Sequence, residues 1–323
     1  MASTSRMPPS PAMAEAQDIL LGLTRLPRSI PSKYFYDDHG SALFDAITEL
    51  PEYYPTRAEQ GLLDRVADEI AGAVQATELA ELGAGSARKT RRLIRAMTRG
   101  NGRFCYTPMD ISPYALQEAE SSVSREFPGV EVKGIRCDYT RSLEALDPLP
   151  GSLTAFLGST IGNFTRTRAV RLLRRLRSRL HPGDYFLLGV DLVKPVEILE
   201  EAYNDAQGIT AEFNKNILRV VNREAQGNFR PEDFQHLAFF NERESQIEMH
   251  LVARKTVRVR LERFDLDMAL EPGDGIRTEI SRKFTEASCA GLLKDGGFRL
   301  ERWFASEDNY FGLALARAMD EEE

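Results

Sequence analysis

Short apolar runs alternate with amphipathic segments between residues 78 and 191. Runs of five to nine residues that are apolar throughout are typical of parallel strands covered on both faces, and amphipathic helices supply the cover. The pattern therefore predicts a doubly wound α/β core. The expected strands are 78–82, 104–110, 130–138, 152–158 and 185–191, and the expected helices are 57–75, 88–97, 114–126 and 166–180.

The pattern changes after residue 195. Residues 195–230 read as helical, and the next two segments alternate apolar and polar positions with period two, as antiparallel strands do. The alternating positions are Ile247, Met249 and Leu251, then Val257, Val259 and Leu261. The chain ends in a helix–strand–strand pattern. We expect an α+β insertion in the α/β core, with short helices over 18–54 and a loose tail over residues 1 to about 16.

Composition narrows the function classes. The 323 residues carry 42 basic and 49 acidic side chains, a formal net charge of −7, which argues against a general nucleic-acid or anionic-membrane binder. No apolar run of 18 residues and no signal-peptide pattern is found. The three widely spaced cysteines indicate reduced thiols in a cytoplasmic protein, and the four histidines have no metal-ligand spacing, so we expect no metal.

Two glycines follow the first expected strand in the sequence Glu81-Leu82-Gly83-Ala84-Gly85. Glycines at such a turn let the backbone approach a ligand, and the next helix offers free N–H groups. Dinucleotide-binding loops place a third glycine where this chain has Arg88, which disfavours an NAD-dependent oxidoreductase. An acidic residue two positions before the first glycine is instead typical of class I S-adenosylmethionine (SAM) methyltransferases.

Polar residues end the next two expected strands. Asp110 ends the second strand, where a carboxylate can bridge both ribose hydroxyls of an adenosyl group, and Asp138 with Tyr139 ends the third. Open α/β sheets bind their ligands at the carboxyl ends of parallel strands. This set of residues therefore favours an adenosyl cofactor at that edge.

The chain resembles the histidine Nα-methyltransferases of ergothioneine biosynthesis over almost its whole length from about Leu21. The resemblance implies a class I SAM-methyltransferase Rossmann-like domain and a second, α+β substrate-binding domain. It divides the chain at 1–57 (substrate domain), 58–192 (SAM domain), 193–283 (substrate-binding insertion) and 284–323 (SAM domain). The matching segments, in order, are LPEYYPTRAE, ELGAGSARKT, FLGSTIGNFT, GVDLVK, AYNDAQGITAEFNKN, IEMHLVA and TEISRKF.

The resemblance also implies site residues and their roles. Two positions depart from the family pattern, Ser112 in place of an acidic residue and Tyr139 in place of Phe, and neither removes a needed group. The residues expected around SAM are Tyr36, Gly83, Lys89, Asp110, Asp138 and Tyr139. Those expected at the amino-acid end of the substrate are Tyr53, Asn163 and Tyr203, and those at its imidazole are Met249, Glu279 and Ser281.

The chemistry of methyl transfer suits these residue types. Displacement at a sulfonium is an in-line reaction, so catalysis consists mostly of aligning a neutral amine with the methyl group. Oxygens of Tyr53 and Asn163 can orient that amine without adding charge, and these two are the expected catalytic residues. Glu279 and Ser281 are two apart, so on a strand they share a face, where they could accept both ring N–H groups of histidine. Indole and phenol would leave a buried Glu279 unpaired, at about 1–3 kcal/mol.

We therefore expect SAM-dependent trimethylation of the α-amino group of L-histidine to hercynine. One alternative keeps the fold and takes the α-amine of another aromatic amino acid. A second is a noncatalytic SAM-binding sensor or partner protein. The seven arginines of residues 166–179 are interpreted as a solvated helix face, with binding of an acidic partner as the alternative.

Overall fold

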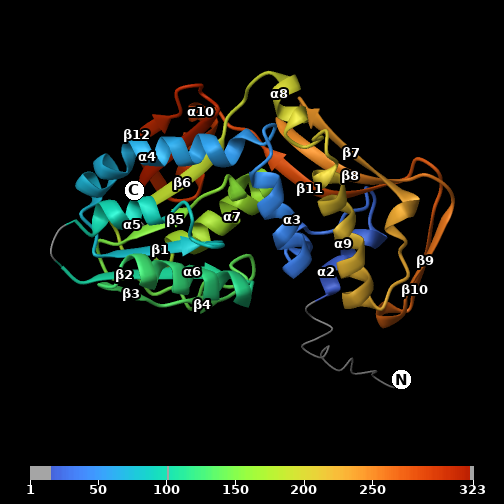
Figure 1. Cartoon of the computed structure of the whole chain (residues 1–323), viewed down its shortest axis with the longest axis horizontal. Coiled ribbons are helices and arrows are strands. Elements are labelled where there is room, and N and C mark those ends of the chain that lie inside the picture. Colours follow the sequence, from blue (N-terminus) through green and yellow to red (C-terminus); the bar gives the residue numbers. More distant parts are fainter. Residues whose placement is uncertain (1–15, 100–101, 321–323) are drawn as a thin grey trace, which may run out of the picture. The chain divides into compact units, whose positions relative to one another are not determined.

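The computed structural model describes residues 16–99 and 102–320, so the loose tail expected at the start of the chain falls almost entirely outside the described residues. The chain forms two compact units (Figure 1). Unit 1 comprises Met1–Glu49, Tyr203–Phe239 and Glu248–Glu279, and unit 2 comprises Leu50–Ala202, Phe240–Ile247 and Ile280–Glu323.

Unit 2 is built on a predominantly parallel sheet with the order β12-β13-β6-β5-β1-β2-β3, and β4 pairs with β2 beside β3. β13 runs antiparallel to both β6 and β12, whereas the remaining pairs are parallel. The strand order reverses at β1, which pairs with β2 on one side and with β5 on the other. Its strands are β1 Glu78–Leu82, β2 Phe104–Asp110, β3 Val130–Val132, β4 Ile135–Arg136, β5 Leu153–Phe156, β6 Tyr185–Asp191, β12 Phe298–Ala305 and β13 Phe311–Ala318.

Helices cover both faces of this sheet (Figure 1). Successive residues of β6 alternate between two buried clusters, with Leu187 in one and Phe186 and Leu188 in the other, as side chains of a pleated strand must. The first cluster contains apolar residues of α4 Tyr54–Val74, α5 Arg91–Met97 and α6 Pro113–Glu126; the second contains those of α7 Arg166–Arg177 and α10 Glu286–Asp295. The expected α/β architecture is thus confirmed.

The single strand expected over 130–138 is divided into β3 and β4. Both pieces pair with β2, at Phe104–Tyr106 and at Met109–Asp110, and residues 133–134 between them belong to neither strand. The expectation of one strand was therefore wrong because apolar periodicity does not reveal an interruption of two residues in the backbone ladder.

The solvated arginine face expected from the sequence is present only in part, since Arg175, Arg177 and Arg179 are half-buried. The exposed members are Arg166, Arg168, Arg171 and Arg174. The Arg175 guanidinium donates to the carbonyls of Tyr139, Thr140 and Arg141, at 2.8 to 3.0 Å. Other arginines on the helix or just after it also donate to carbonyls. Arg174 donates to Asp295, Arg177 to Leu180 and Met319, and Arg179 to Glu144 and Leu146. These arginines therefore anchor the loops that run beside the helix.

Unit 1 packs its two longest helices, α3 Asp38–Thr48 and α9 Ile209–Ala225, against each other. Phe35 stacks on Phe213 of α9 with ring centroids 4.4 Å apart. β9 and β10 form an antiparallel pair in the region where the sequence predicted such strands. The other elements of this part of the fold are α2 Gln17–Thr24, η1 Ser32–Phe35, η3 Pro231–Asp233, β9 Val257–Leu261, η4 Glu262–Phe264 and β10 Leu266–Leu270.

A further sheet has the order β11-β8-β7, with β7 Phe234–Asn241, β8 Gln246–Ala253 and β11 Gly275–Arg282. Each of these strands contributes residues to both units. The sequence pattern had indicated β8 but not β7. The helical segment expected over 195–230 contains two helices, α8 Val196–Glu201 and α9, separated by residues 202–208.

Candidate active site

The loop after β1 in unit 2 has a conformation that its glycines permit. Gly83 and Gly85 both have left-handed backbones, with φ of +66° and +53°, a region that costs glycine little. The loop is attached to the end of β2, because the N–H groups of Gly83 and Ala84 donate to the carbonyl of Met109. The glycine loop therefore lies at the carboxyl edge of the sheet, close to Asp110.

The Asp110 carboxylate accepts two backbone hydrogen bonds, from Gly85 at 3.0 Å and from Ser112 at 2.9 Å. Burial raises the pKa of Asp110 above its ordinary value, and these backbone donors oppose the shift. Each carboxylate oxygen has a second lone pair, so the group can still accept from the two hydroxyls of a ribose. Ser112, the departure from the family pattern, caps α6 by accepting from the N–H of Ala115.

Tyr139 lies beside the glycine loop. A Cβ atom built at Gly83 would be 3.5 Å from the Tyr139 hydroxyl, and the Tyr139 ring packs edge-on against Phe156 at 5.5 Å. Asp138 precedes it and accepts a hydrogen bond from the Thr140 N–H. Arg175 of α7 binds the carbonyl of Tyr139, so the same loop is held from a helix as well as from the sheet.

Glu81, the acidic residue of the glycine motif, points into the core. Its carboxylate accepts from the hydroxyls of Thr90 and Tyr106, each at 2.5 Å, and only 3% of the residue is exposed. Burial raises its pKa to about 7. Glu81 thus attaches the start of α5 to the sheet, a structural role that the motif alone did not indicate.

Lys89 is held by a buried carboxylate that the sequence analysis did not identify. Its Nζ lies 2.5 Å from Oε2 of Glu59, whose side chain has no exposed surface. Glu59 also accepts from the Gly158 N–H at 2.7 Å. A Cβ at Gly189 of β6 would lie 2.5 Å from Oε1 of Glu59, so the absence of a side chain there makes room for the carboxylate.

Three of the residues expected to bind the amino acid lie in unit 2. Tyr53 is the N-cap residue of α4, Asn163 ends η2 Thr160–Asn163, and Ser281 is in β11. The η2 turn packs closely on the chain next to Ser281, because a Cβ at Gly162 would be 2.9 Å from the carbonyl oxygen of Arg282. Asn163 and Ser281 therefore belong to neighbouring segments.

A buried ionic cluster lies at the carboxyl end of β6. Asp191, 1% exposed, accepts from Lys194 at 2.5 Å, from Lys283 at 2.7 Å and from the Tyr54 hydroxyl. Burial by itself would raise the pKa of Asp191, but the two ammonium groups hold it below its ordinary value. Burial also lowers the pKa of Lys194 to about 8. No spacing in the sequence indicated this cluster, since Tyr54 and Lys283 lie far along the chain from Asp191.

The remaining expected site residues lie in unit 1, namely Tyr36, Tyr203, Met249 and Glu279. The Tyr36 ring packs edge-on against Phe44 and Phe213, with centroids 5.7 and 5.9 Å away. It therefore forms part of the aromatic cluster on α3 and α9. Tyr203 and Met249 are both buried, at 8% and 1% exposure.

A chain of hydrogen bonds connects two of these residues, Tyr203 and Met249. The ring of His236 bonds to the Tyr203 carbonyl at 2.9 Å and to the Asn214 amide at 2.8 Å. Asn214 in turn accepts from the Thr278 hydroxyl, which also contacts the Met249 carbonyl. Thr278 is the neighbour of Glu279 on β11. A neutral His236 ring satisfies both contacts, since Nε2 can donate to the carbonyl while Nδ1 accepts from the amide.

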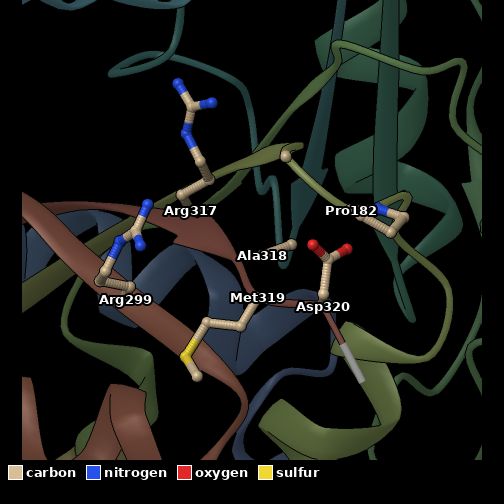
Figure 2. Close-up of a pocket in the computed structure, with 7 residues that line it drawn as sticks. Pro182, Arg299, Arg317, Ala318, Met319 and Asp320 are labelled. Atoms are coloured by element: carbon tan, nitrogen blue, oxygen red, sulfur yellow. The ribbon is translucent and has the colours of Figure 1, made fainter. Parts of the chain in front are cut away.

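A surface pocket of about 270 Å³ lies elsewhere in unit 2 (Figure 2). Its lining includes Arg299, Arg317 and Asp320 but none of the expected site residues. Arg317 is opposite Tyr185 at the start of β6, so the pocket is at the amino ends of the parallel strands. Ligands of such sheets bind at the other edge. The Arg317 charge is also paired with Glu301 and bonded to the Tyr185 hydroxyl.

Over residues 16–99 and 102–320, no group of three or more His, Cys, Asp or Glu side chains has the arrangement of a metal site. None of the helices in the same ranges is long and apolar enough to cross a membrane.

Comparison with known proteins decides the family. A model of the family described as "Histidine-specific methyltransferase, SAM-dependent" matches residues 15–318. The chain belongs to this family. The description of the family states that its members depend on SAM, so SAM is the cofactor. The carboxyl edge of the sheet in unit 2 suits this molecule. At this edge Gly83 is exposed, and the Asp110 carboxylate has lone pairs that can accept from the hydroxyls of a ribose.

Curated relatives of the histidine-specific methyltransferases agree with this membership. The histidine N-alpha-methyltransferase of Mycolicibacterium smegmatis is 41% identical over 95% of this chain and 96% of its own length. That of Mycobacterium tuberculosis is 40% identical over 94% and 95%. Ergothioneine biosynthesis protein 1 of Schizosaccharomyces pombe is 31% identical over 84% of this chain and 36% of its own length.

Proposed function

We propose that this protein transfers methyl groups from SAM to the α-amine of L-histidine three times, producing hercynine in ergothioneine biosynthesis. The observation that carries the proposal is made in a chain of this family: the glycine loop contacts both Asp110 and Tyr139 at the carboxyl edge of the sheet. The names of the curated relatives support histidine as the substrate and ergothioneine as the pathway.

SAM supplies an electrophilic methyl group when it is bound. In our proposal, Gly83 lets the backbone approach the cofactor, Asp110 accepts from its ribose, and Asp138 with Tyr139 contacts the adenine. Lys89 pairs with the carboxylate of SAM, and the aromatic ring of Tyr36 lies beside its positively charged sulfonium. Support for Lys89 comes from the ion pair with Glu59, which fixes its ammonium near Gly158 at the end of β5.

Tyr53 and Asn163 are proposed to orient the α-amine, and Tyr203 to bind the same end of the amino acid. Their side-chain oxygens can accept from the N–H groups of the amine and direct its lone pair. Neutral acceptors suit this task, because the amine becomes more substituted and finally cationic as methyl groups accumulate. Alignment of this kind supplies most of the rate in an in-line displacement.

Met249, Glu279 and Ser281 are proposed to bind the imidazole. A carboxylate and a hydroxyl two residues apart on β11 can engage both ring nitrogens, while Met249 gives an apolar contact. An amino acid with an indole or phenol in this position would leave polar groups unpaired, and this mismatch favours histidine.

Mass spectrometry of L-histidine incubated with SAM and the purified protein tests the proposal. We expect mass increases of one, two and three methyl groups, with one S-adenosylhomocysteine released for each. Preferential methylation of tryptophan or tyrosine would assign the protein to another aromatic amino acid. SAM binding without turnover in the presence of histidine would instead indicate a sensor. Both outcomes contradict the proposal.

We further propose that the enzyme acts in the cytoplasm on a small molecule, without a nucleic-acid, membrane or metal partner. The net charge of −7 supports the first two exclusions, since such surfaces attract cationic proteins. Full activity after dialysis against a chelator, and no retention on anionic vesicles or nucleic acid, are the expected results. Loss of activity that added metal restores would contradict the metal-free proposal.

A further inference from the structure

Lys283 contacts Ser281 from within the buried ionic cluster. Its Nζ lies 2.9 Å from the Ser281 hydroxyl oxygen and 2.7 Å from Oδ2 of Asp191. The Lys283 side chain has no exposed surface, and Ser281 is 5% exposed. The contact is therefore removed from water, where interactions with an ammonium are strongest.

The direction of this hydrogen bond is fixed by chemistry. An ammonium has three donors and no acceptor, so the Ser281 oxygen must be the acceptor. The Asp191 carboxylate and the carbonyl of residue 192 hold the second lysine of the cluster, Lys194, in a similar way. Accepting from a cation polarises the Ser281 O–H bond, which makes the hydroxyl a better donor and a poorer second acceptor.

We infer that Lys283 is a positioning residue that makes Ser281 a hydrogen-bond donor to the substrate. This inference rests on the proposed function, in which Ser281 binds the imidazole. The ring nitrogen opposite Ser281 then carries a lone pair, and the other nitrogen carries the proton. The protein selects a neutral imidazole in one tautomer.

This assignment revises the expectation from the sequence, in which Ser281 and Glu279 accept from both ring N–H groups. Glu279, as a carboxylate, keeps its role as the acceptor. Ser281 takes the opposite role because of Lys283, whose position two residues further along gave no indication of the contact. A ring with both a donor and an acceptor is therefore required, and among the aromatic side chains only neutral imidazole has both among its ring atoms.

The test compares two lysines that share one carboxylate. Lys283→Met removes the cation that contacts Ser281, whereas Lys194→Met removes the other cation of Asp191 and serves as the matched control. Both variants leave Asp191 with a single lysine partner. Near- and far-ultraviolet circular dichroism and binding of S-adenosylhomocysteine establish that each variant is folded.

The probes are L-histidine and its two pyrrolylalanine analogues, in which one or the other ring nitrogen is replaced by carbon. One of them keeps the N–H that faces Glu279 and lacks the acceptor that faces Ser281. Calorimetric titration in the presence of S-adenosylhomocysteine gives the ratio of histidine affinity to analogue affinity. This ratio reports on the ring contact and is insensitive to a uniform loss of binding.

We expect Lys283→Met to lower the ratio for that analogue by about tenfold, the effect of one charge-assisted hydrogen bond. Lys194→Met should keep the wild-type ratio. In a Ser281→Ala background the Lys283 substitution should have no further effect on the ratio, because the hydroxyl through which it acts is gone.

Three results would overturn the inference: an unchanged ratio in Lys283→Met, equal changes in both lysine variants, or a Lys283 effect that persists without Ser281. If both lysine variants fail to fold, the Ser281→Ala variant decides, since an unchanged ratio there excludes a donor role. A wild-type enzyme that does not methylate histidine would refute the proposed function instead, so the two failures are distinguishable.

Discussion

Glu59 and Lys89 form an ion pair in which the carboxylate is fully buried and the ammonium is one quarter exposed. The other oxygen of Glu59 accepts the N–H of Gly158 at the end of β5. A carboxylate from α4 therefore sets the position of a lysine that we propose to pair with the SAM carboxylate. In this proposal, Lys89 reaches the cofactor only because the buried carboxylate of Glu59 directs its ammonium.

Replacing Glu59 with Gln should weaken cofactor binding. The amide can still accept from Gly158, but its NH₂ group faces the Lys89 ammonium, and two donors repel each other. We expect about tenfold weaker binding of S-adenosylhomocysteine by calorimetry, together with a loss of about 1–3 kcal/mol in the free energy of unfolding. Glu69→Gln is the control, because Glu69 lies on the same helix in an exposed pair with Arg302. Unchanged affinity in Glu59→Gln would contradict a role for Lys89 in cofactor binding.

Asp110 and Glu279 should affect different ligands. We expect Asp110→Ala to weaken S-adenosylhomocysteine binding about 10- to 100-fold, because the ribose hydroxyls lose an ionised acceptor. Glu279→Ala should leave that affinity within about twofold and weaken histidine binding by a similar 10- to 100-fold. Calorimetric titration of each variant with each ligand measures the four values. Equal weakening of both ligands by both substitutions would show that our division of the site is wrong.

Arg175 should influence the cofactor through the loop that it anchors. Replacing it with Met removes the donors to the carbonyls of residues 139–141 and frees the backbone that carries Asp138 and Tyr139. We expect severalfold weaker binding of S-adenosylhomocysteine. Arg179→Met removes comparable bonds to residues 144 and 146 and should reduce thermal stability without changing that affinity. Equal affinity losses in the two variants would indicate a general effect on stability.

His236 should make stability depend on pH. Burial lowers its pKa below the ordinary value of about 6.5, so the folded protein resists protonation that the unfolded chain accepts. Stability is therefore fully present above pH 6.5 and falls as the pH drops below it, by up to about 1.4 kcal/mol per pH unit from this group. Urea unfolding of wild type and His236→Gln at pH 7.5 and 5.5 measures the effect. The variant should show a smaller loss on acidification, and an equal loss would exclude His236 as its source.

Much of the sheet in unit 2 could be predicted from apolar runs. β1, β2 and β6 begin and end where the sequence indicated, because a strand buried on both faces is apolar along its whole length. β7 was missed: it reads FQHLAFFN and its burial does not alternate regularly, so period two is weak. The division between β3 and β4 depends on backbone pairing, which side-chain polarity does not report.

The glycine loop and the residues at strand ends could also be located from the sequence, since their positions follow from strand boundaries. The groups that support them could not. Glu59, Asp191, Lys194 and Lys283 look like ordinary charged residues, and only the fold brings their partners together. The arginines of α7 illustrate the same limit, because a carbonyl partner on a distant loop leaves no trace in helical periodicity.

Gly189 on β6 has one further consequence. A methyl group there would collide with the Glu59 carboxylate. A substitution inside the sheet would therefore displace Glu59 and, with it, the Lys89 ammonium at the carboxyl edge. A random-mutagenesis screen for weakened cofactor use should therefore recover changes at this core position, although it touches neither reactant. In this protein, affinity for the methyl donor can therefore be changed from inside a strand, at a position that leaves the acceptor site untouched.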